Sequence, residues 1–191
     1  MISGLKEDGI IESAGRAGSH PDCVVRKAAM HDIGPILGLI NGYAANGIML
    51  PRTEMEVSED IRDFSVIVTA GRLVGCGALK LYNQEVAEIL SLCVDETLKS
   101  KGIGRQVMDE LLNEAEDFGL KTVFALTVAP TFFEKLGFHE VPRERFPTKV
   151  WRDCLRCERY TCCNEKAVTL ELSDRPTKLG ESATEAAEVT S

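Results

Sequence analysis

The stretch that decides the fold is Lys99-Ser100-Lys101-Gly102-Ile103-Gly104-Arg105. An apolar segment ends before it at Val94, and residues 104–118 repeat apolar side chains at the spacing of a helix. A glycine turn between a strand and a helix aims several free backbone N–H groups and the positive helix end at one point. Glycine also places no Cβ in the way of a ligand. The stretch therefore predicts a cradle for a pyrophosphate.

Three basic residues stand in this turn. Lys99, Lys101 and Arg105 add positive charge that can also bind a second phosphate. A Gly-x-Gly pair before a helix also occurs in tight turns that bind nothing, so on this stretch alone both interpretations stay open. A Rossmann fingerprint requires Gly-x-Gly-x-x-Gly, and a P-loop requires Gly-Lys followed by Ser or Thr. Neither motif occurs in this sequence.

The rest of the chain predicts an α/β (α+β) fold. Apolar runs indicate strands near Val24 and Val25 and at 64–68, 73–81, 86–94, 121–126, 137–141 and 166–172. Helical spacing indicates helices at 33–40, 53–62, 104–118 and 131–136, the first with Asp32 as its N-cap. We therefore expect a mixed central sheet of about six to seven strands, flanked by about four helices.

Length and charge restrict the class of protein. At 191 residues with 44% hydrophobic residues, the chain can form one full core. We expect one domain over 23–172, a flexible segment at 1–22 and a disordered tail at 173–191. The net charge of -8 argues against broad binding to nucleic acid. No apolar run could span a membrane and no secretory signal is visible, so we expect a cytoplasmic protein with reduced thiols.

Together with a second motif, the glycine turn resembles the GNAT acetyltransferase superfamily. The first hallmark of that superfamily, Gln/Arg-x-x-Gly-x-Gly/Ala before a helix, corresponds here to residues 99–104, where Lys99 replaces the usual first residue but keeps a positive charge. The second hallmark, a short helix ending in Leu-Gly-Phe, is present as Leu136-Gly137-Phe138. The resemblance implies a GNAT fold and acetyl-CoA as co-substrate.

Within the superfamily, residues 24–172 look like the stand-alone bacterial N-acetylglutamate synthases, amino-acid N-acetyltransferases that begin arginine biosynthesis. The supporting stretches are GIMLPR at 47–52, CGALK at 76–80, EILSLCV at 88–94, FALT at 124–127 and PTKVWRDC at 147–154. This resemblance implies transfer of acetyl from acetyl-CoA to the α-amino group of L-glutamate. The implied partners are these two small molecules, with no nucleic acid and no membrane.

The resemblance also assigns catalytic and cofactor-binding residues. Acetyl transfer needs a neutral amine, so a base must take a proton from the substrate ammonium, and Glu88 matches the base of the family. Thr127 matches a hydroxyl that returns a proton to the CoA thiolate, although a relayed water or a purely structural Thr fits equally well. The expected acetyl-CoA contacts are Cys93, Val94, Lys99, Lys101, Gly102, Ile103, Gly104 and Arg105.

Glutamate presents two carboxylates, so its pocket needs separated cations. By resemblance, Arg52 grips the α-carboxylate and Ser91 adds a backbone contact. Lys80, Lys149 and Arg152 are candidates for the side-chain carboxylate. Solvated surface charge is the equal alternative for these three.

Other interpretations stay open at two places. Many family members carry a Tyr that protonates the thiolate where this chain has Phe133, which has no proton to give. The alternatives are an acetyltransferase for another amino acid or a polyamine, or a non-catalytic acetyl-CoA sensor; a homodimer is also left open.

Cys154, Cys157, Cys162 and Cys163 have ligand-like spacing, but adjacent cysteines rarely bind one ion together, so we assign no metal site.

Overall fold

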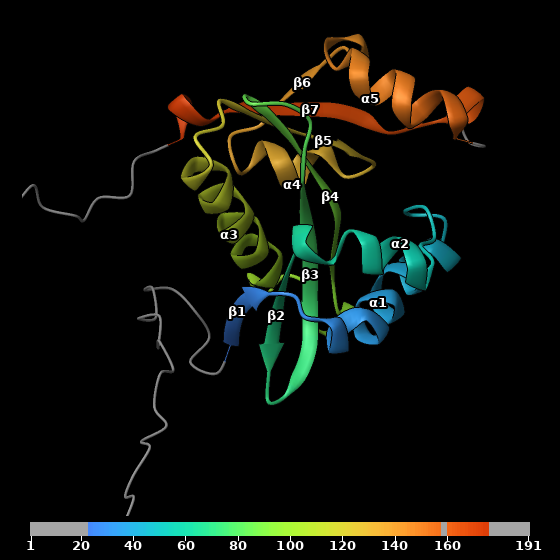
Figure 1. Ribbon diagram of the computed structural model, residues 1–191, viewed down its shortest axis with the longest axis vertical. Helices are drawn as coiled ribbons and strands as arrows, with labels where there is room; N and C mark the ends of the chain where they lie inside the picture. Colours follow the sequence, from blue (N-terminus) through green and yellow to red (C-terminus); the bar gives the residue numbers. More distant parts are fainter. Residues whose placement is uncertain (1–22, 158–159, 176–191) are drawn as a thin grey trace, which may run out of the picture.

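A seven-stranded mixed sheet forms the centre of the computed structural model, which describes residues 23–157 and 160–175 (Figure 1). The strands lie in the order β1-β2-β3-β4-β5-β7-β6, and every neighbouring pair is antiparallel except β4 and β5. The strands are β1 (Cys23–Lys27), β2 (Phe64–Thr69), β3 (Arg72–Leu81), β4 (Val86–Val94), β5 (Thr122–Thr127), β6 (His139–Val141) and β7 (Lys166–Glu171). The mixed sheet predicted from the sequence is confirmed.

Five α-helices of the described residues flank this sheet. They are α1 (Ile33–Ala45), α2 (Glu54–Glu59), α3 (Ile103–Asp117), α4 (Pro130–Glu134) and α5 (Pro147–Arg152). The helix α3 covers one face, and α1 and α2 cover the other (Figure 1). None of the helices within 23–157 and 160–175 is long and apolar enough to cross a membrane.

The helix α5 was not expected from the sequence. Its first residue is Pro147, which reads as a loop signal but also suits the first helical turn, where an N–H has no partner to lose. The second expected helix is also shorter than 53–62, because α2 ends at Glu59 and a 3-10 turn follows at Ile61–Asp63. The side chain of Thr53 caps α2 by accepting a hydrogen bond from the backbone of Glu56.

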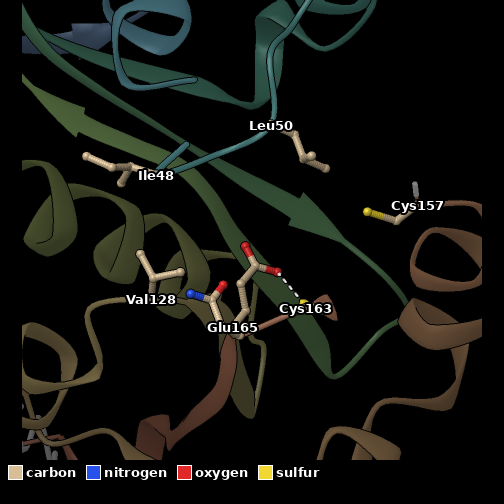
Figure 2. A pocket seen from close by; sticks show the side chains of 7 residues that line it. Ile48, Leu50, Val128, Cys157, Cys163 and Glu165 are labelled. Carbon is tan, nitrogen blue, oxygen red and sulfur yellow. Dashed lines mark hydrogen bonds between the residues drawn. The ribbon is translucent and has the colours of Figure 1, made fainter. Parts of the chain in front are cut away.

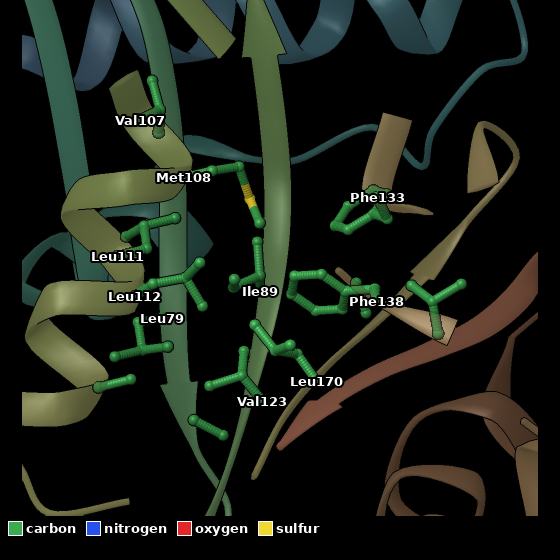
Figure 3. Close-up of a cluster of buried hydrophobic side chains, with 14 of the residues drawn as sticks. Leu79, Ile89, Val107, Met108, Leu111, Leu112, Val123, Phe133, Phe138 and Leu170 are labelled. Carbon is green, nitrogen blue, oxygen red and sulfur yellow. The ribbon is translucent and has the colours of Figure 1, made fainter. Parts of the chain in front are cut away.

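The apolar face of α3 packs on the sheet as its spacing predicts. Val107 and Leu111 are fully buried in a cluster that includes Ile89 and Val123 (Figure 3). The helix approaches β3 so closely that a Cβ at Gly77 would lie 3.0 Å from side-chain atoms of both Val107 and Leu111. A larger residue at position 77 must therefore push α3 away from the sheet.

Asp32 is the N-cap residue of α1, as expected, but its side chain makes no capping bond to that helix. Instead it accepts a hydrogen bond of 2.8 Å from the backbone of Ala29 and forms an ion pair of 2.6 Å with Arg26. Asp32 thus closes the short 3-10 turn Met30–Asp32 that precedes the helix. The sequence correctly placed a polar residue directly before the helix, but the side chain of that residue stabilises the preceding turn.

The described chain continues three residues past the expected domain end at 172. Residues Leu172–Asp174 form a 3-10 turn, and Leu172 is buried. Arg175 then lies 3.0 Å from Glu116 and 3.6 Å from Asp109, both on α3. The expected flexible segment at 1–22 lies outside the described residues, as does the tail from 176 onward.

Candidate active site

The parallel strands β4 and β5 part after a short paired segment. Glu88 and Phe124 form the last of three register pairs, and no further β4–β5 pair occurs in the described part of the chain. A bulge bends β4 beyond this point, because its register against β3 shifts and Ser91 adopts a φ of +54°. Peptide groups on the facing edges of the two strands consequently lack a ladder partner. We call these unpaired edges of β4 and β5 the slot, and their free peptide groups suit an extended ligand with amide groups.

The slot leads to the N-terminus of α3. Gly102 is the N-cap of this helix and has a φ of +84°, a left-handed conformation that favours glycine. The first intrahelical bond runs 3.0 Å from the backbone N of Gln106 to the carbonyl of Gly102. The N–H groups of residues 103–105 precede that bond and have no partner in the helix. With Lys101 exposed beside them, these groups fit a pyrophosphate.

Lys99, expected at the cradle, lies instead beside α1. Its Nζ is 3.0 Å from Glu96 and 4.7 Å from the ring centre of Tyr43. The Tyr43 hydroxyl donates a hydrogen bond of 2.7 Å to the carbonyl of Val94. One of the expected acetyl-CoA contacts therefore already has an intramolecular partner. The side chain of Arg105 is exposed and forms a long ion pair within α3.

Other expected contacts can act through their backbone alone. The side chain of Ile103 is buried in the core. The Cys93 thiol is also buried, with its sulfur 3.4 Å from that of Cys76, and both cysteines are free. The carbonyl of Ser91 faces the same two thiols, at 3.5 Å from Cys93 and 3.8 Å from Cys76. Cys93 is thus a packed core residue on the α1 side of the sheet.

Glu88 lies in a buried ionic network, with only 2% of its surface exposed. Its Oε1 is 2.9 Å from the Nζ of Lys149, and its Oε2 accepts a hydrogen bond of 2.9 Å from the hydroxyl of Tyr82. Asp153 Oδ2 is 3.0 Å from the Tyr82 hydroxyl and 3.1 Å from Lys149. Arg152 lies 3.1 Å from Asp153 and 4.3 Å from the centre of the Tyr82 ring. The expected base and two of the expected cations therefore meet at one place.

Burial and charge act in opposite directions on this network. Burial raises the pKa of Glu88, and the charge and hydrogen bond of Lys149 offset only part of this rise. Burial lowers the pKa of Lys149, but the charge of Glu88 raises it overall. Burial also disfavours ionised Asp153, yet the hydrogen bond from Arg152 and the charge of Lys149 lower its pKa to about 2. Glu88 and Lys149 therefore form a buried ion pair, and burial moves the pKa of Glu88 toward the range of a general base.

Arg52 and Lys80, the other expected cations, share one acidic partner. Arg52 Nη2 is 2.6 Å from Asp60, and the Nζ of Lys80 forms an ion pair with the same carboxylate. Lys80 also lies 3.3 Å from Asp63. The Nε of Arg52 is buried and has no hydrogen-bond partner within the described residues. Lys80 stands opposite Glu88 in the β3–β4 register, so the two side chains leave the same face of the sheet.

Thr127 closes β5 three residues beyond Phe124, or about 10 Å along the strand. Its Oγ1 accepts a hydrogen bond of 3.0 Å from the backbone of Ala129. This bond gives Thr127 a structural role and leaves its own hydroxyl hydrogen able to donate. Phe133 is buried against Phe138, with ring centres 5.3 Å apart, so it is a core residue.

A pocket is lined by residues that lie close in sequence to Arg52 and Thr127 (Figure 2). Leu50 stands two residues before Arg52, and Val128 directly follows Thr127. The pocket is lined by Ile48, Leu50, Val128, Cys157, Cys163, Asn164 and Glu165. The Cys163 thiol lies 3.4 Å from the guanidinium of Arg143. Among residues 23–157 and 160–175, no three His, Cys, Asp or Glu side chains gather as they would around a metal ion.

Sequence reasoning missed Tyr82, Asp153 and Asp60. Tyr82 follows Lys80 by two residues in a hairpin, so the alternation of a strand could have placed it on the face of Glu88. Asp153 follows Lys149 by four residues, the spacing of neighbours on a helix, but that helix itself was not predicted. Asp60 carried no signal, because its contacts with Arg52 and Lys80 depend on how α2 packs.

The sequence matches the family model described as acetyltransferase (GNAT) family over residues 41–138. An uncharacterized N-acetyltransferase of Chlorobaculum tepidum is 39% identical over 151 residues, which cover 79% of this chain and 97% of that protein. The amino-acid acetyltransferase of Mycobacterium tuberculosis is 34% identical over 140 residues, which cover 71% of this chain and 80% of that protein.

Solved structures give the same comparison in three dimensions. N-acetylglutamate synthase from Neisseria gonorrhoeae, in complex with coenzyme A and N-acetyl-glutamate, superposes with a TM-score of 0.73 at 26% identity. The match covers 81% of this chain but 36% of that one. A Mycobacterium tuberculosis protein in complex with CoA and NLQ superposes with a TM-score of 0.66 at 29% identity, covering 78% of this chain and 98% of that one.

Proposed function

Because the chain belongs to the acetyltransferase (GNAT) family, and is therefore an acetyl-CoA-dependent N-acetyltransferase, we propose that its acceptor is the α-amino group of L-glutamate. The product, N-acetylglutamate, would place the enzyme at the first step of arginine biosynthesis. The observation that carries the proposal is the position of Glu88, a buried carboxylate at the point where β4 and β5 part. The slot beyond it leads to the phosphate cradle, and the names of similar proteins point to an amino-acid acceptor.

Glu88 acts as the general base in this proposal. An amino acid arrives as an ammonium ion and cannot attack until it loses a proton. Glu88 takes that proton, and its raised pKa makes it a stronger base than an exposed carboxylate. Lys149 and Tyr82 each hold one oxygen of the carboxylate and so fix its orientation. Acetyl-CoA, when bound, supplies the activated acetyl thioester.

The chain also provides groups for the acetyl donor. Backbone groups of residues 91–94 on β4 would bind the pantetheine amides and the acetyl oxygen, because they face the slot where β5 no longer pairs. The N–H groups of residues 103–105 and the side chains of Lys101 and Arg105 would hold the phosphates. Thr127 can donate its hydroxyl hydrogen toward the thiolate.

The carboxylates of glutamate would bind to the cations expected from the sequence. Arg52 has a guanidinium that a carboxylate can grip with two hydrogen bonds, and its Nε has no hydrogen-bond partner in the part of the chain that the structure describes. Lys80, Lys149 and Arg152 are the candidates for the second carboxylate. Each of these cations has an acidic partner in the structure, so the substrate must share or displace that partner.

One observation favours an acceptor with fewer negative charges. Asp60 and Asp63 balance the charges of Arg52 and Lys80. Glu88 and Asp153 balance those of Lys149 and Arg152. With its charges balanced in this way, the site attracts a dicarboxylate less strongly than free cations would. Another amino acid, or a polyamine, is therefore the second candidate acceptor.

An acceptor panel tests the proposal. The protein is incubated with acetyl-CoA and each of L-glutamate, L-glutamine, other amino acids and polyamines, and free thiol release is followed over time. Mass spectrometry of the product then verifies N-acetylation. The proposal expects the highest kcat/KM with L-glutamate. Faster turnover of another amine would retain the enzyme class and replace the acceptor, and release no faster than buffer with every amine would support a sensor.

A further inference from the structure

Acetylation of an ammonium ion by a thioester yields an amide and a thiol and releases one proton in each turnover. In the proposed function, on which this inference rests, Glu88 takes that proton. Glu88 is 2% exposed, so water reaches it poorly once the site is filled. The described groups that contact its oxygens are the Lys149 ammonium and the Tyr82 hydroxyl. The proton must therefore leave by one of these groups or through the substrate pocket.

We propose that Tyr82 and Asp153 form the exit route by which the proton on Glu88 reaches solvent. The Tyr82 hydroxyl lies 2.9 Å from Glu88 Oε2 and 3.0 Å from Asp153 Oδ2, so it bridges two carboxylates. In one concerted step, the O–H bond of protonated Glu88 breaks as a new O–H bond forms on Tyr82. The original O–H bond of Tyr82 breaks as its hydrogen binds Asp153. Asp153 then gives the proton to water, and every group returns to its starting protonation state.

Lys149 cannot serve as this exit. Its ammonium is already fully protonated beside Glu88 and has no lone pair to accept another proton. A hydroxyl, in contrast, accepts and donates at the same time. Tyr82 never has to ionise in the concerted step, which matters because burial and the two carboxylates raise its pKa far above the ordinary value.

Asp153 suits the last position of the route. Its side chain is 38% exposed, whereas Glu88 is almost completely enclosed. Its low pKa of about 2, set by Arg152 and Lys149 against the effect of burial, means that it holds a proton only briefly before water takes it. The carboxylate therefore acts as a short-lived carrier between the buried base and solvent.

The ring of Tyr82 is fixed on both sides. The guanidinium of Arg152 lies 4.3 Å from its centre, and Phe124 meets it edge to face at 5.4 Å. Phe124 is itself stacked on Phe146 at 3.9 Å. These contacts hold the hydroxyl between the two carboxylates, so Phe at position 82 would keep the packing and remove only the relay atom.

The charged groups around Glu88 come from two elements. From α5 and the residue that follows it come Lys149, Arg152 and Asp153. From β3 comes Lys80, which faces Asp60 and Asp63. The Cys154 thiol lies next in the chain, is buried, and has a raised pKa, so it stays neutral. Among these groups, Asp153 alone combines a hydrogen bond from the Tyr82 hydroxyl with access to water.

The test compares Tyr82→Phe and Asp153→Asn with the parent enzyme, using thiol release with the best acceptor of the panel. Tyr160→Phe, which alters an exposed tyrosine away from the network, is the matched control. We expect kcat to fall at least about tenfold in both relay variants, because proton release becomes slow. The KM for acetyl-CoA should stay within about twofold in both variants, and the acceptor KM should do so in Tyr82→Phe, which keeps every charge of the site. Added imidazole buffer should raise kcat of Asp153→Asn in proportion to its concentration and leave the parent unchanged, because the side chain at position 153 is 38% exposed and an added base can take the proton there.

A kcat within about twofold of the parent for either variant, or a fall in Asp153→Asn that imidazole does not relieve, overturns the relay. Circular dichroism checks that each variant is folded; should Tyr82→Phe not fold, Asp153→Asn decides. Glu88→Gln separates this inference from the proposed function. Full activity of Glu88→Gln would show that Glu88 is not the base, which contradicts the proposed function. If Glu88→Gln is inactive and Tyr82→Phe is fully active, only the relay is overturned.

Discussion

The ion pair of Glu88 and Lys149 allows a quantitative prediction for Lys149→Met. This change keeps most of the side-chain volume but removes the cation 2.9 Å from a carboxylate that is almost completely buried. The folded variant then has two options. It can keep an unpaired buried charge, at a cost of about 3–5 kcal/mol, or it can protonate Glu88.

Protonation of Glu88 sets the upper limit of the stability that Lys149→Met can lose. Relative to an unfolded-state pKa of about 4.3, protonating Glu88 costs about 3.7 kcal/mol at pH 7 and about 1 kcal/mol at pH 5. In the variant the pKa of folded Glu88 lies above its unfolded value, so the folded state binds more protons and loses stability as pH rises. Lys149→Met should therefore be destabilised by at most about 3.7 kcal/mol at pH 7, and far less at pH 5.

Urea unfolding followed by circular dichroism at pH 5, 6 and 7 measures this change. Lys166→Met is the control, because it removes an exposed cation 2.8 Å from Glu140. An exposed pair contributes at most about 1 kcal/mol, with little change over this pH range. A loss for Lys149→Met that is the same at pH 5 and pH 7, or no larger than that of the control, would refute the buried ion pair.

Three further changes address substrate binding, packing and the cradle. Arg52→Ala should raise the KM for glutamate by about 10- to 100-fold and leave the KM for acetyl-CoA nearly unchanged. Arg62→Ala, at an exposed position, is the control. Equal effects of Arg52→Ala on both KM values would contradict the role of Arg52 in binding glutamate. Gly77→Ala should destabilise the protein by about 1–3 kcal/mol in urea unfolding, because α3 lies so close to this position. Gly38→Ala is the matched control: a Cβ there meets nothing within 4 Å, so this change should stabilise the protein by about 0.5–1 kcal/mol. Gly102→Ala should cost about 1–2 kcal/mol at its positive φ and weaken acetyl-CoA binding in calorimetry, and unchanged affinity would argue against a cradle that depends on this turn.

Local patterns were enough to predict the frame of the molecule. The apolar period of residues 104–118 placed α3 to within about one residue of its observed bounds at each end. The apolar runs at 64–68 and 73–81 predicted β2 and β3, and the glycine turn before residue 104 predicted a helix directly after it. In each case the information lies in neighbouring residues, because helix and strand periods and glycine turns are local properties.

The parts that were missed depend on distant residues. The helix α5 is six residues long and begins with Pro147, so it offers no sustained apolar period. Tyr82 and Asp153 are 71 positions apart and meet only after α5 packs on the sheet. The shared partner of Arg52 and Lys80, Asp60, likewise depends on the packing of α2. Single charged residues could be predicted as site candidates, but their pairing could not.

The central claim is that Glu88 is the base for acetylation of glutamate, and the pH dependence of kcat/KM tests it most directly. The parent and Glu88→Gln are compared by thiol release from pH 5 to pH 9. We predict that the parent loses activity on acidification with an apparent pKa above the ordinary value for Glu, because burial raises the pKa of Glu88. Glu88→Gln should be about 100- to 10,000-fold slower and lack this acid limb. Near-parent activity of Glu88→Gln with the same acid limb would contradict the role of Glu88 as the base.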